Sequence, residues 1–309
     1  MTTKKIIMDG DPGHDDAIAI ILAAARPELD IIGITTVSGN ADIDNTTRNA
    51  LKICDLVGLN DVIVSQGASK PLVRLRETAP SIHGDSGLDG PDLPEPSRSW
   101  SHEHGADTIS RLAREAAEPV TLLATGPLTN VALALAKTPG IQANINEIVL
   151  MGGGTSGNWT PTAEFNIWAD PEAARSVFES GIPITVMGLD ITHQALATPE
   201  VIKQINSIDN NVAQVVGELL DFFTSTYQET FNFKSAPVHD VLTAAYCVAP
   251  ELFTMQDVNI AVETKGEFTA GTTAVDLQGV TGRETNAKFG TELDVDGFWT
   301  LMINALKTY

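Results

Sequence analysis

The sequence has few cysteines, few basic residues and no long apolar run. Cys54 and Cys247 are the only cysteines among 309 residues. Each falls in an apolar helical pattern outside any C-x-x-C pair, so we expect buried free thiols and no disulfide framework. The longest apolar runs, such as residues 17–25, are too short to span a bilayer. The N-terminus enters a strand pattern with no apolar signal-peptide core, which predicts a cytoplasmic protein.

Basic residues are outnumbered two to one by acidic residues. The chain has 19 Lys and Arg against 40 Asp and Glu, a net charge of −21. A nucleic acid or an anionic membrane surface would need a basic cluster, and none is found in the sequence. We therefore expect a small-molecule partner, with no nucleic acid and no membrane. The 43% content of hydrophobic residues is ordinary for a globular protein.

Short β-rich runs alternate with helical segments over the first 190 residues. The expected strands are nearly continuous apolar runs, as in a parallel sheet covered on both faces. They are residues 4–9, 30–37, 62–66, 120–125, 147–152 and 184–190. This alternation predicts an α/β fold: one domain over residues 1–309, with an open, mostly parallel sheet flanked by helices.

Capping residues predict where two of the helices begin and end. One helix should begin at the cap Asn45 and stop at Gly58, and another should begin at the cap Asp170 and stop at Gly181. From about residue 199 a long helical stretch is followed by a β-rich tail. The long loop of residues 67–105 is rich in Pro, Gly and Ser, and loops of this length are often lids or substrate loops.

Four aspartates crowd into the stretch IIMDGDPGHDD, residues 6–16. Carboxylates this close repel one another unless a positive charge lies among them. The segment is therefore either a solvated acidic turn or a cation site. Clustered oxygen donors suit Ca²⁺ or Mg²⁺ better than Zn²⁺. An EF-hand is excluded because its Glu at loop position 12 and its central Gly have no match here.

Polar, glycine-rich motifs follow the predicted strands one after another. They are Asp9-Gly-Asp11, Ser38-Gly-Asn40, Thr125-Gly126, residues 152–159 and Asp190. Since ligands bind at the carboxyl ends of parallel strands, these motifs should meet at one edge of the sheet. Three other motifs are incomplete. Residues 152–157 fit the dinucleotide-binding pattern G-x-G-x-x-G, but no helix follows directly. No serine has the G-x-S-x-G context, and the HEH at 102–104 lacks the i, i+4 spacing of a zinc-binding helix.

Further candidates lie outside the acidic cluster, and each has a structural alternative. Glu164 and Asn166 face the same way in an extended segment and could bind a polyol, or they form an ordinary approach to a helix. His239 and Asp240 precede an apolar helix, which Asp240 could simply cap. His83 lies in the long loop, where a histidine is usually exposed. His14 and His193 are taken as structural.

Together these motifs resemble the inosine-uridine nucleoside hydrolase family, from about residue 4 to the C-terminus. D-P-G-x-D-D, V-S-G-N, A-T-G-P-L-T-N, A-E-F-N and V-H-D occur in that order. The resemblance implies a Ca²⁺-dependent N-ribohydrolase of nucleoside salvage that works as a homotetramer or homodimer. It implies calcium ligation by Asp11, Asp15, Asp16, the carbonyl of Thr125, and Asp240, with Asp11 also the general base. It implies substrate contacts from Asn40, His83, Met151, Asn158, Glu164, Phe165, Asn166, Tyr227 and His239.

The expected chemistry is attack of water on C1′ as the bond to the base breaks, with Asp11 taking the proton from the water. His239 is the expected proton donor to the base, kept protonated by nearby carboxylates, and His83 is the second candidate. A pocket with this many carboxylates, Asp9 among them, should repel a 5′-phosphate. Pyrimidine or broad inosine/uridine preference stays open. The alternatives are a non-catalytic Ca²⁺-dependent ribose-binding protein and a D-x-D phosphatase.

Overall fold

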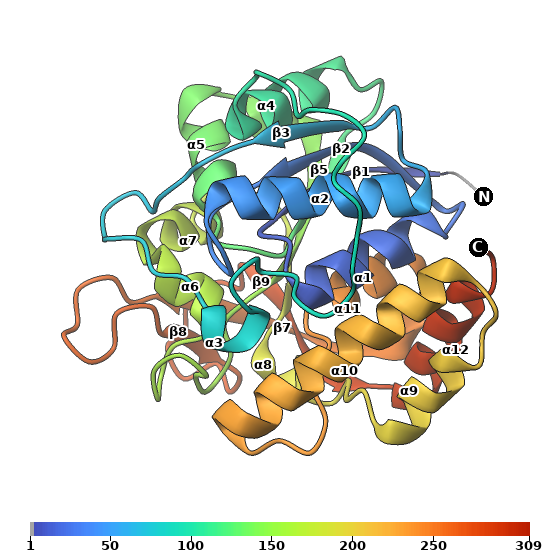
Figure 1. Ribbon diagram of the computed structural model, residues 1–309. Coiled ribbons are helices and arrows are strands. Elements are labelled where there is room, and N and C mark those ends of the chain that lie inside the picture. The colour runs from blue at the N-terminus through green and yellow to red at the C-terminus, as the bar shows by residue number, and fades with distance from the viewer. Residues whose placement is uncertain (1–2) are drawn as a thin grey trace.

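A nine-stranded sheet runs through the computed structural model, which describes residues 3–309. Helices cover both faces of this sheet (Figure 1). In spatial order the strands are β3 (Ile63–Gln66), β2 (Leu29–Thr36), β1 (Lys4–Gly10), β4 (Val120–Ala124), β5 (Ile145–Met151), β6 (Ile184–Met187), β9 (Ala287–Leu293), β7 (Phe253–Val262) and β8 (Thr273–Asp276). The strands pair in parallel from β3 to β9, so the prediction of a single α/β domain with a mostly parallel sheet is confirmed.

Successive residues of the central strands point to opposite faces and build two separate apolar cores. In β1, Ile6 and Met8 pack into one core, and Ile7 packs into the other. The first core takes in α1 (His14–Ala24), α2 (Ile43–Val57), α9 (Pro199–Asn206), α10 (Asn211–Phe231), α11 (Val241–Val248) and α12 (Val295–Leu306). The second takes in α4 (Gly105–Glu115), α5 (Thr129–Lys137) and α7 (Pro171–Phe178). Burial on both faces explains the continuous apolar runs.

Helix boundaries differ from the sequence prediction by a few residues. Helix α2 begins earlier than expected, because the cap is Asp42, whose side chain accepts a hydrogen bond from the backbone N of Asn45. It ends at Gly58 as predicted, with a φ of 77°. Asp170 and Pro171 open α7 as predicted, but the helix ends at Phe178, before Gly181. Short helices α3 (Pro80–His83), α6 (Phe165–Ala169) and α8 (Leu189–Thr192) complete the set.

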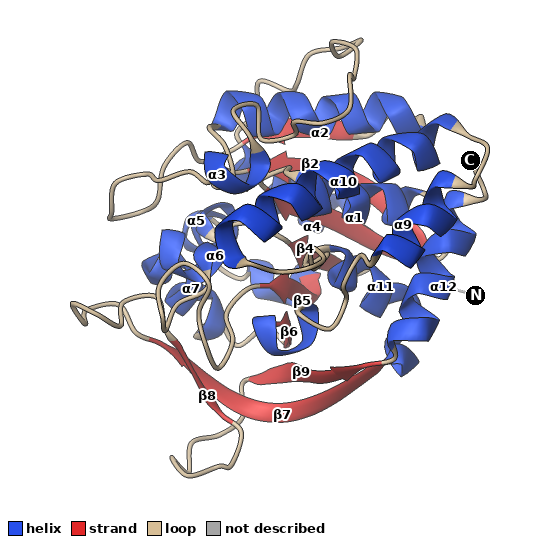
Figure 2. Cartoon of the chain, turned by 60° about the horizontal axis from the view of Figure 1, so that its bottom comes forward, coloured by secondary structure: helices blue, strands red, loops and turns tan. Residues whose placement is uncertain are grey.

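The C-terminal part contains an antiparallel extension and a helix that the sequence analysis missed. Strand β7 pairs antiparallel with both β9 and β8, and Figure 2 shows this curved edge below the helices. Helix α12 follows β9 and is capped by Asp294, whose side chain accepts a hydrogen bond from Gly297 N. The tail predicted as β-rich, residues 258–296, contains β8, β9 and part of β7, and α12 lies almost wholly beyond it. Both cysteines are buried free thiols, as predicted. Within residues 3–309, no helix combines the length and apolar character needed to cross a membrane.

The order of the strands reverses between β1 and β4. From β1 the chain proceeds outward to β2 and β3, and then returns to place β4 on the other side of β1. In open parallel sheets, such a switch point leaves a crevice at the carboxyl ends of the two strands. The Asp-rich segment leaves β1 here, and Thr125-Gly126 leaves β4 here. The fold thus brings the two motifs together.

Candidate active site

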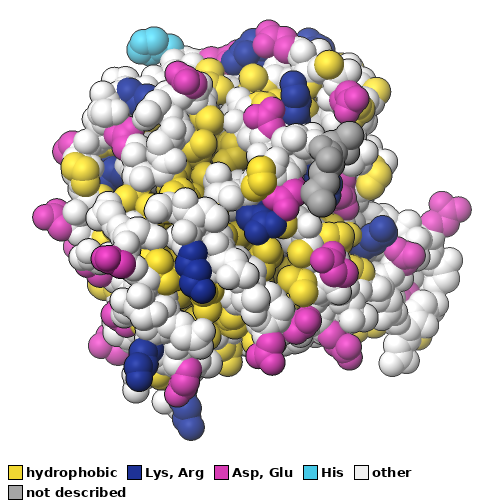
Figure 3. Space-filling model, turned by 90° about the vertical axis from the view of Figure 1, so that its right-hand side faces the viewer, with side chains coloured by type: hydrophobic (Ala, Val, Ile, Leu, Met, Phe, Trp, Pro, Cys, Tyr) yellow, Lys and Arg dark blue, Asp and Glu magenta, His cyan; other side chains and the backbone are white. Residues whose placement is uncertain are grey.

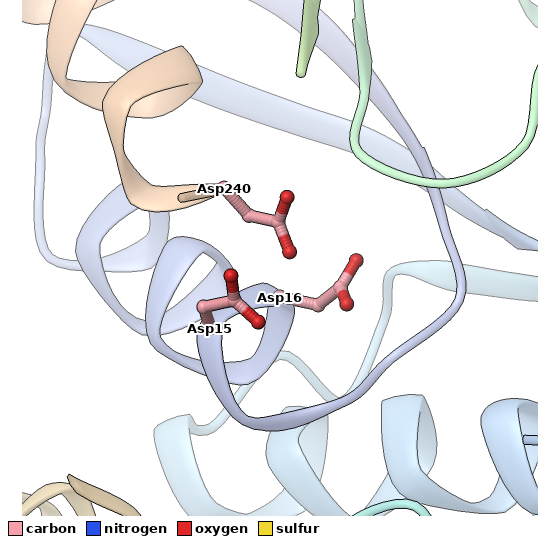
Figure 4. Close-up of side chains that lie close together, drawn as sticks. All are labelled: Asp15, Asp16 and Asp240. Atoms are coloured by element: carbon pink, nitrogen blue, oxygen red, sulfur yellow. The ribbon is translucent and has the colours of Figure 1, made fainter. Parts of the chain in front are cut away.

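Three carboxylates meet where α1 and α11 begin. Asp15 and Asp16 belong to the first turn of α1, and Asp240 immediately precedes α11. Figure 4 shows their oxygens pointing toward one another, and one ligand atom from each lies within 4.8 Å of the others. Asp240 occupies the cap position of α11, but its side chain makes no capping hydrogen bond. The structure therefore favours the site interpretation of Asp240 over the capping one.

Asp11 is buried beside this trio without being part of it. Its Oδ2 accepts a hydrogen bond from the backbone N of Asn40 at 2.6 Å, and its Oδ1 has no hydrogen-bond partner among the described residues. A Cβ at Gly39 or Gly126 would collide with its carboxylate oxygens. The glycines of the V-S-G-N and A-T-G motifs therefore leave the space that this carboxylate occupies. An unpartnered buried carboxylate oxygen calls for a ligand or a proton.

Asp16 and Thr125 connect the two central strands. Thr125 Oγ1 donates to Asp16 Oδ1 at 2.6 Å, and the carbonyl of Thr125 accepts a hydrogen bond from Asn166 Nδ2 at 2.9 Å. Asp9 behaves differently, since its Oδ1 accepts from Thr35 Oγ1 at 2.5 Å and from Asn130 Nδ2 at 2.8 Å. Of the six carboxylates predicted for the pocket, Asp15, Glu164 and Asp240 line the cavity, whereas Asp9, Asp11 and Asp16 do not. The side chain of Asp9 links the end of β1 to β2 through Thr35 and to α5 through Asn130.

Burial makes the charged form of these carboxylates unfavourable. It raises the pKa of Asp15 to about 7, with the charge of Asp16 adding to the effect. Burial and the charge of Asp16 raise the pKa of Asp11 well above its usual range. Burial and the charge of Asp15 do the same for the pKa of Asp240. All are at most 4% exposed, so the solvated-turn interpretation is wrong.

The donor set fits a hard divalent cation. The trio offers carboxylate oxygens alone, and one oxygen of Asp240, Oδ1, is buried without a hydrogen-bond partner. No lysine or arginine is found among the described residues that line the cavity, so no side-chain cation neutralises the cluster. Oxygen-only sites of this kind suit Ca²⁺ or Mg²⁺. Acidic side chains are also spread over the face in Figure 3, where lysines and arginines lie singly among them.

A cavity opens beside the trio, and the predicted substrate residues line it. Asn40, Met151, Asn158, Glu164 and Asn166 all belong to its wall, together with Asp15, Thr125 and Asp240. Asn166 Nδ2 donates to the carbonyls of Thr125 and Met151. Asn158 Oδ1 accepts from the backbone N of Phe165 at 3.0 Å, which ties the 152–159 loop to α6. The five strand-end motifs thus converge as predicted, except that Asp190 bonds Thr155 outside the cavity.

Glu164 caps a helix and lines the cavity at the same time. Its Oε1 accepts from the backbone N of Asn166, and its Oε2 accepts from Gly153 and Ile167. The segment is therefore not extended as predicted, because Asn166 already lies in the first turn of α6. Burial raises the pKa of Glu164 to about 7 in spite of these three N–H donors. Glu164 can therefore belong to the start of a helix and also bind a ligand in the cavity, so the two alternatives given for it are compatible.

The far side of the cavity is aromatic. Phe223, Tyr227 and Phe231 are spaced four residues apart and share one face of α10. Phe165 packs edge-on against Trp159, with 4.8 Å between the ring centroids. Sequence analysis named Phe165 and Tyr227 and missed the rest of this wall, which comprises Ala79, Ile82, Trp159, Phe223 and Phe231. The i, i+4, i+8 spacing of aromatic residues in α10 was a signal that could have revealed part of it.

His239 is held on both ring nitrogens. Its Nδ1 lies 2.8 Å from Thr192 Oγ1, and its Nε2 lies 2.7 Å from the hydroxyl of Tyr227. Its backbone N donates to Asp15 Oδ2 at 3.1 Å, which links it to the trio. Burial, and then the neighbouring His193, lower the pKa of His239 well below its usual range. The expectation that carboxylates keep this ring protonated was wrong, because burial and then His193 dominate its pKa, and both lower it.

His83 also lines the cavity, and it is buried although it lies in the long loop. It ends the short helix α3 and is 5% exposed. Its Nδ1 lies 3.1 Å from Nδ1 of His14, which is itself completely buried. His193 lies beside His239, with ring centroids 5.6 Å apart. The predicted histidines therefore gather on the aromatic side, and His239 links that side to the carboxylates through its backbone N.

Comparison with known proteins identifies relatives along the whole chain. Residues 6–300 match the family model of the inosine-uridine preferring nucleoside hydrolases. The pyrimidine-specific ribonucleoside hydrolase RihA of Shewanella woodyi is 48% identical over 309 residues, covering 99% of each chain. RihA of an Escherichia coli strain is 47% identical, covering 98% of each chain.

Solved structures agree with this match. A purine-preferring ribonucleoside hydrolase from Gardnerella vaginalis superposes with a TM-score of 0.92 at 34% identity, covering 98% of each chain. A plant nucleoside hydrolase superposes with a TM-score of 0.90 at 30% identity, covering 98% of this chain and 99% of its own. With a family model matched over nearly the full length and a cavity lined by the family's motifs, the chain belongs to the inosine-uridine preferring nucleoside hydrolases.

Proposed function

We propose that this nucleoside hydrolase is a calcium-dependent N-ribohydrolase that cleaves pyrimidine ribonucleosides to ribose and free base. The observation that carries the proposal is the cavity itself, with buried carboxylates on one side and an aromatic wall on the other. The carboxylate side suits a cation and the hydroxyls of a ribose. The aromatic side suits the flat face of a base.

Asp11, Asp15, Asp16, Asp240 and the carbonyl of Thr125 would hold the ion. Bound calcium would supply Lewis-acid chemistry, making a nearby water easier to deprotonate. Asp11 would take the proton, since its Oδ1 is buried and free of hydrogen bonds within residues 3–309. The oxygen of that water forms a bond to C1′ while the bond from C1′ to the base nitrogen breaks. Attack from the face opposite the base is the inverting arrangement.

The ribose would lie against Asn40, Asn158, Glu164 and Asn166, with Met151 packed below. Amide groups and carboxylates take the hydrogen bonds of hydroxyls. The carboxylates would also stabilise the positive charge that develops on the ribose as the base departs. Since their interaction with this charge is strongest in the transition state, it would raise kcat more than it lowers KM.

The departing base needs a proton, and the pair of Tyr227 and His239 is placed to provide one. Both line the cavity, and the Tyr227 hydroxyl lies 2.7 Å from His239 Nε2. Burial raises the pKa of Tyr227 well above its usual range, so the phenol keeps its proton. We propose that Tyr227 donates its proton to the base nitrogen, and that neutral His239, with Nδ1 accepting from Thr192, would stabilise the phenolate by donating a hydrogen bond from Nε2 until solvent returns the proton after the base leaves. Tyr227→Phe should then lose as much kcat on uridine as His239→Ala does.

Pyrimidine preference is supported by the relatives named pyrimidine-specific, at 47–48% identity over nearly the whole chain. The purine-preferring structure is more distant, at 34% identity. Assembly as a homotetramer or homodimer remains a prediction of the family resemblance, and cytoplasmic location remains a prediction from the sequence. Size-exclusion chromatography with light scattering measures the assembly directly.

One experiment tests the proposal. Exhaustively chelated protein is incubated with uridine, cytidine, inosine and adenosine, and reducing sugar is measured before and after addition of Ca²⁺. We expect no turnover without the ion, recovery with it, and a higher kcat/KM for the two pyrimidine nucleosides. Full turnover in protein shown by elemental analysis to be metal-free would exclude calcium dependence. Nucleoside binding without any sugar release would favour the non-catalytic alternative.

The phosphatase alternative receives no support from the site. The first aspartate of a D-x-D dyad would have to reach the substrate, but Asp9 is turned toward Thr35 and Asn130. A phosphate would also need a positive side chain, and the described lining of the cavity contains none.

A further inference from the structure

His14 lies in the D-P-G-H-D-D segment, and the chemistry above gives it no role. Its side chain is completely buried, and its ring lies parallel to those of Phe222 and Phe223. The ring centroids are 5.1 and 5.2 Å apart, with interplanar angles of 2° and 1°. The plane of the imidazole is therefore fixed, and so are the directions of its two nitrogens.

The partners of those nitrogens determine where its proton lies. Nε2 of His14 is 2.7 Å from the backbone carbonyl of Asp89. A carbonyl can only accept, so Nε2 must carry the hydrogen. No carboxylate is found among the hydrogen-bond partners of the ring within residues 3–309, so its surroundings satisfy a neutral imidazole. In that form, Nδ1 of His14 is bare and can only accept.

This bare nitrogen faces His83. Nδ1 of His83 lies 3.1 Å from Nδ1 of His14, and two lone pairs at that distance would repel. His83 must therefore carry its own hydrogen on Nδ1 to make the contact favourable. A competing donor exists, because the backbone N of His14 also points at Nδ1 of His83, but at 3.4 Å this contact is the longer one. Nε2 of His83 makes no hydrogen bond with any described residue, and the side chain lines the cavity.

We propose that His14 is a positioning residue that holds His83 in the Nδ1–H tautomer, so that the cavity meets a hydrogen-bond acceptor at Nε2. Such an acceptor recognises an N–H group on the edge of the ligand, and both uracil and cytosine carry one. His83 would then read the base and would not protonate it. The inference rests on the proposed function only in taking that ligand to be a nucleobase.

The tautomer can be observed directly in the whole protein without substrate. Protein labelled with ¹⁵N and ¹³C at its six histidines is sedimented and studied by solid-state NMR, which sets no limit on assembly size. Spectra of His83→Gln and His14→Phe assign the two rings. We expect His83 to show a protonated Nδ1 and a bare Nε2 near pH 7.5. A protonated Nε2 with a bare Nδ1 would overturn the proposal, whatever the activity.

Two variants separate positioning from packing. His14→Phe keeps a flat ring against Phe222 and Phe223 but removes the acceptor, so His83 should shift toward the Nε2–H tautomer. His14→Asn offers Oδ1 where Nδ1 stood and should restore the Nδ1–H tautomer. An unchanged His83 spectrum in His14→Phe would show that His14 does not set the tautomer. The wild-type spectrum decides the proposal even if a variant fails to fold.

Kinetics supply a second readout. His14→Phe should lower kcat/KM on uridine about tenfold, the equivalent of one hydrogen bond, and His14→Asn should recover most of it. The matched control is His102→Phe, at an exposed loop position. It should change neither kcat/KM nor the tautomer of His83. Calcium content measured by elemental analysis should stay the same in all variants. If the wild type hydrolyses no nucleoside, the proposed function fails, and the NMR result still decides the tautomer.

Discussion

The carboxylate side and the aromatic side of the cavity come from different parts of the chain. The carboxylates follow β1, begin α1 and begin α11, at the switch point of the sheet. The aromatic side comes from α3, one face of α10 and the loop before α6, none of which belongs to the sheet. Under the proposed function, the carboxylate side meets the ribose, which all ribonucleosides share, and lies at the ends of paired strands. The aromatic side meets the base, and since it lies outside the sheet, its residues can differ without disturbing the strands.

The first prediction tests the carboxylate side and has the largest expected effect. Asp11→Asn should lower kcat on uridine by about 10²–10⁴-fold, the usual cost of losing a general base. The amide keeps the shape of the side chain, so the cradle of Gly39 and Gly126 stays filled. The measurement is kcat at saturating uridine and Ca²⁺. A loss of about threefold or less would mean that another group takes the proton from the water.

The second prediction tests the aromatic side. His239→Ala should lower kcat on uridine by about 10²-fold, at the lower end for proton transfer, with little change in KM. With p-nitrophenyl riboside, whose leaving group needs no proton, the variant should approach wild-type rates. Equal losses on both substrates would instead indicate that the imidazole has a structural role through its hydrogen bonds to Thr192 and Tyr227, and His83 would become the next candidate for the proton donor.

The third prediction uses the charge of the carboxylate side. Uridine should be cleaved with a higher kcat/KM than uridine 5′-monophosphate, since the phosphate enters a cavity whose lining includes carboxylates and, among described residues, no cation. Raising the salt concentration should narrow the difference in kcat/KM only partly, because salt screens charges that are exposed to solvent much more than charges that are buried. Similar kcat/KM values for the two substrates would contradict the electrostatic argument.

The fourth prediction concerns how the stability of the protein depends on pH, and it has the smallest expected effect. The pKa of Asp15 is raised from 3.8 to about 7 in the folded protein, so without metal its contribution to stability is lost as pH rises through that window. Burial lowers the pKa of His14 from 6.5 to about 4, so its contribution is lost as pH falls between those values. Bound Ca²⁺ affects the carboxylates alone. The gain in Tm on adding Ca²⁺ should therefore be larger at pH 8 than at pH 5.

The pH experiment has an internal control. Because the histidine contribution is common to the metal-free and calcium-loaded protein, it cancels in the difference between the two Tm values. A gain that is equal at both pH values, at saturating Ca²⁺, would mean that the carboxylates are already charged in the metal-free protein.

Local sequence patterns were enough to predict the sheet and the acidic cluster after β1, whereas the place of Asp240 in the site was predicted only by the family resemblance. Strands covered on both faces are continuous apolar runs, and the acidic and glycine-rich motifs directly follow them. Helix α12 was missed because its apolar residues directly follow a strand pattern, with only Asp294 marking the boundary. Contacts such as that between His14 and His83, 69 residues apart, depend on tertiary packing. The lowered pKa of His239 likewise depends on burial that no local pattern reveals.

The glycine cradle around Asp11 also limits which acid can serve there. Glutamate carries the same charge on a side chain that is one methylene longer. The carboxylate of Asp11 already lies so close to Gly39 and Gly126 that a Cβ on either glycine would collide with it. Overfilling so tight a space would push either the acid or the two strand ends out of place. The acid that fits at this position is therefore limited by volume as much as by charge, and Gly39 and Gly126 set that limit.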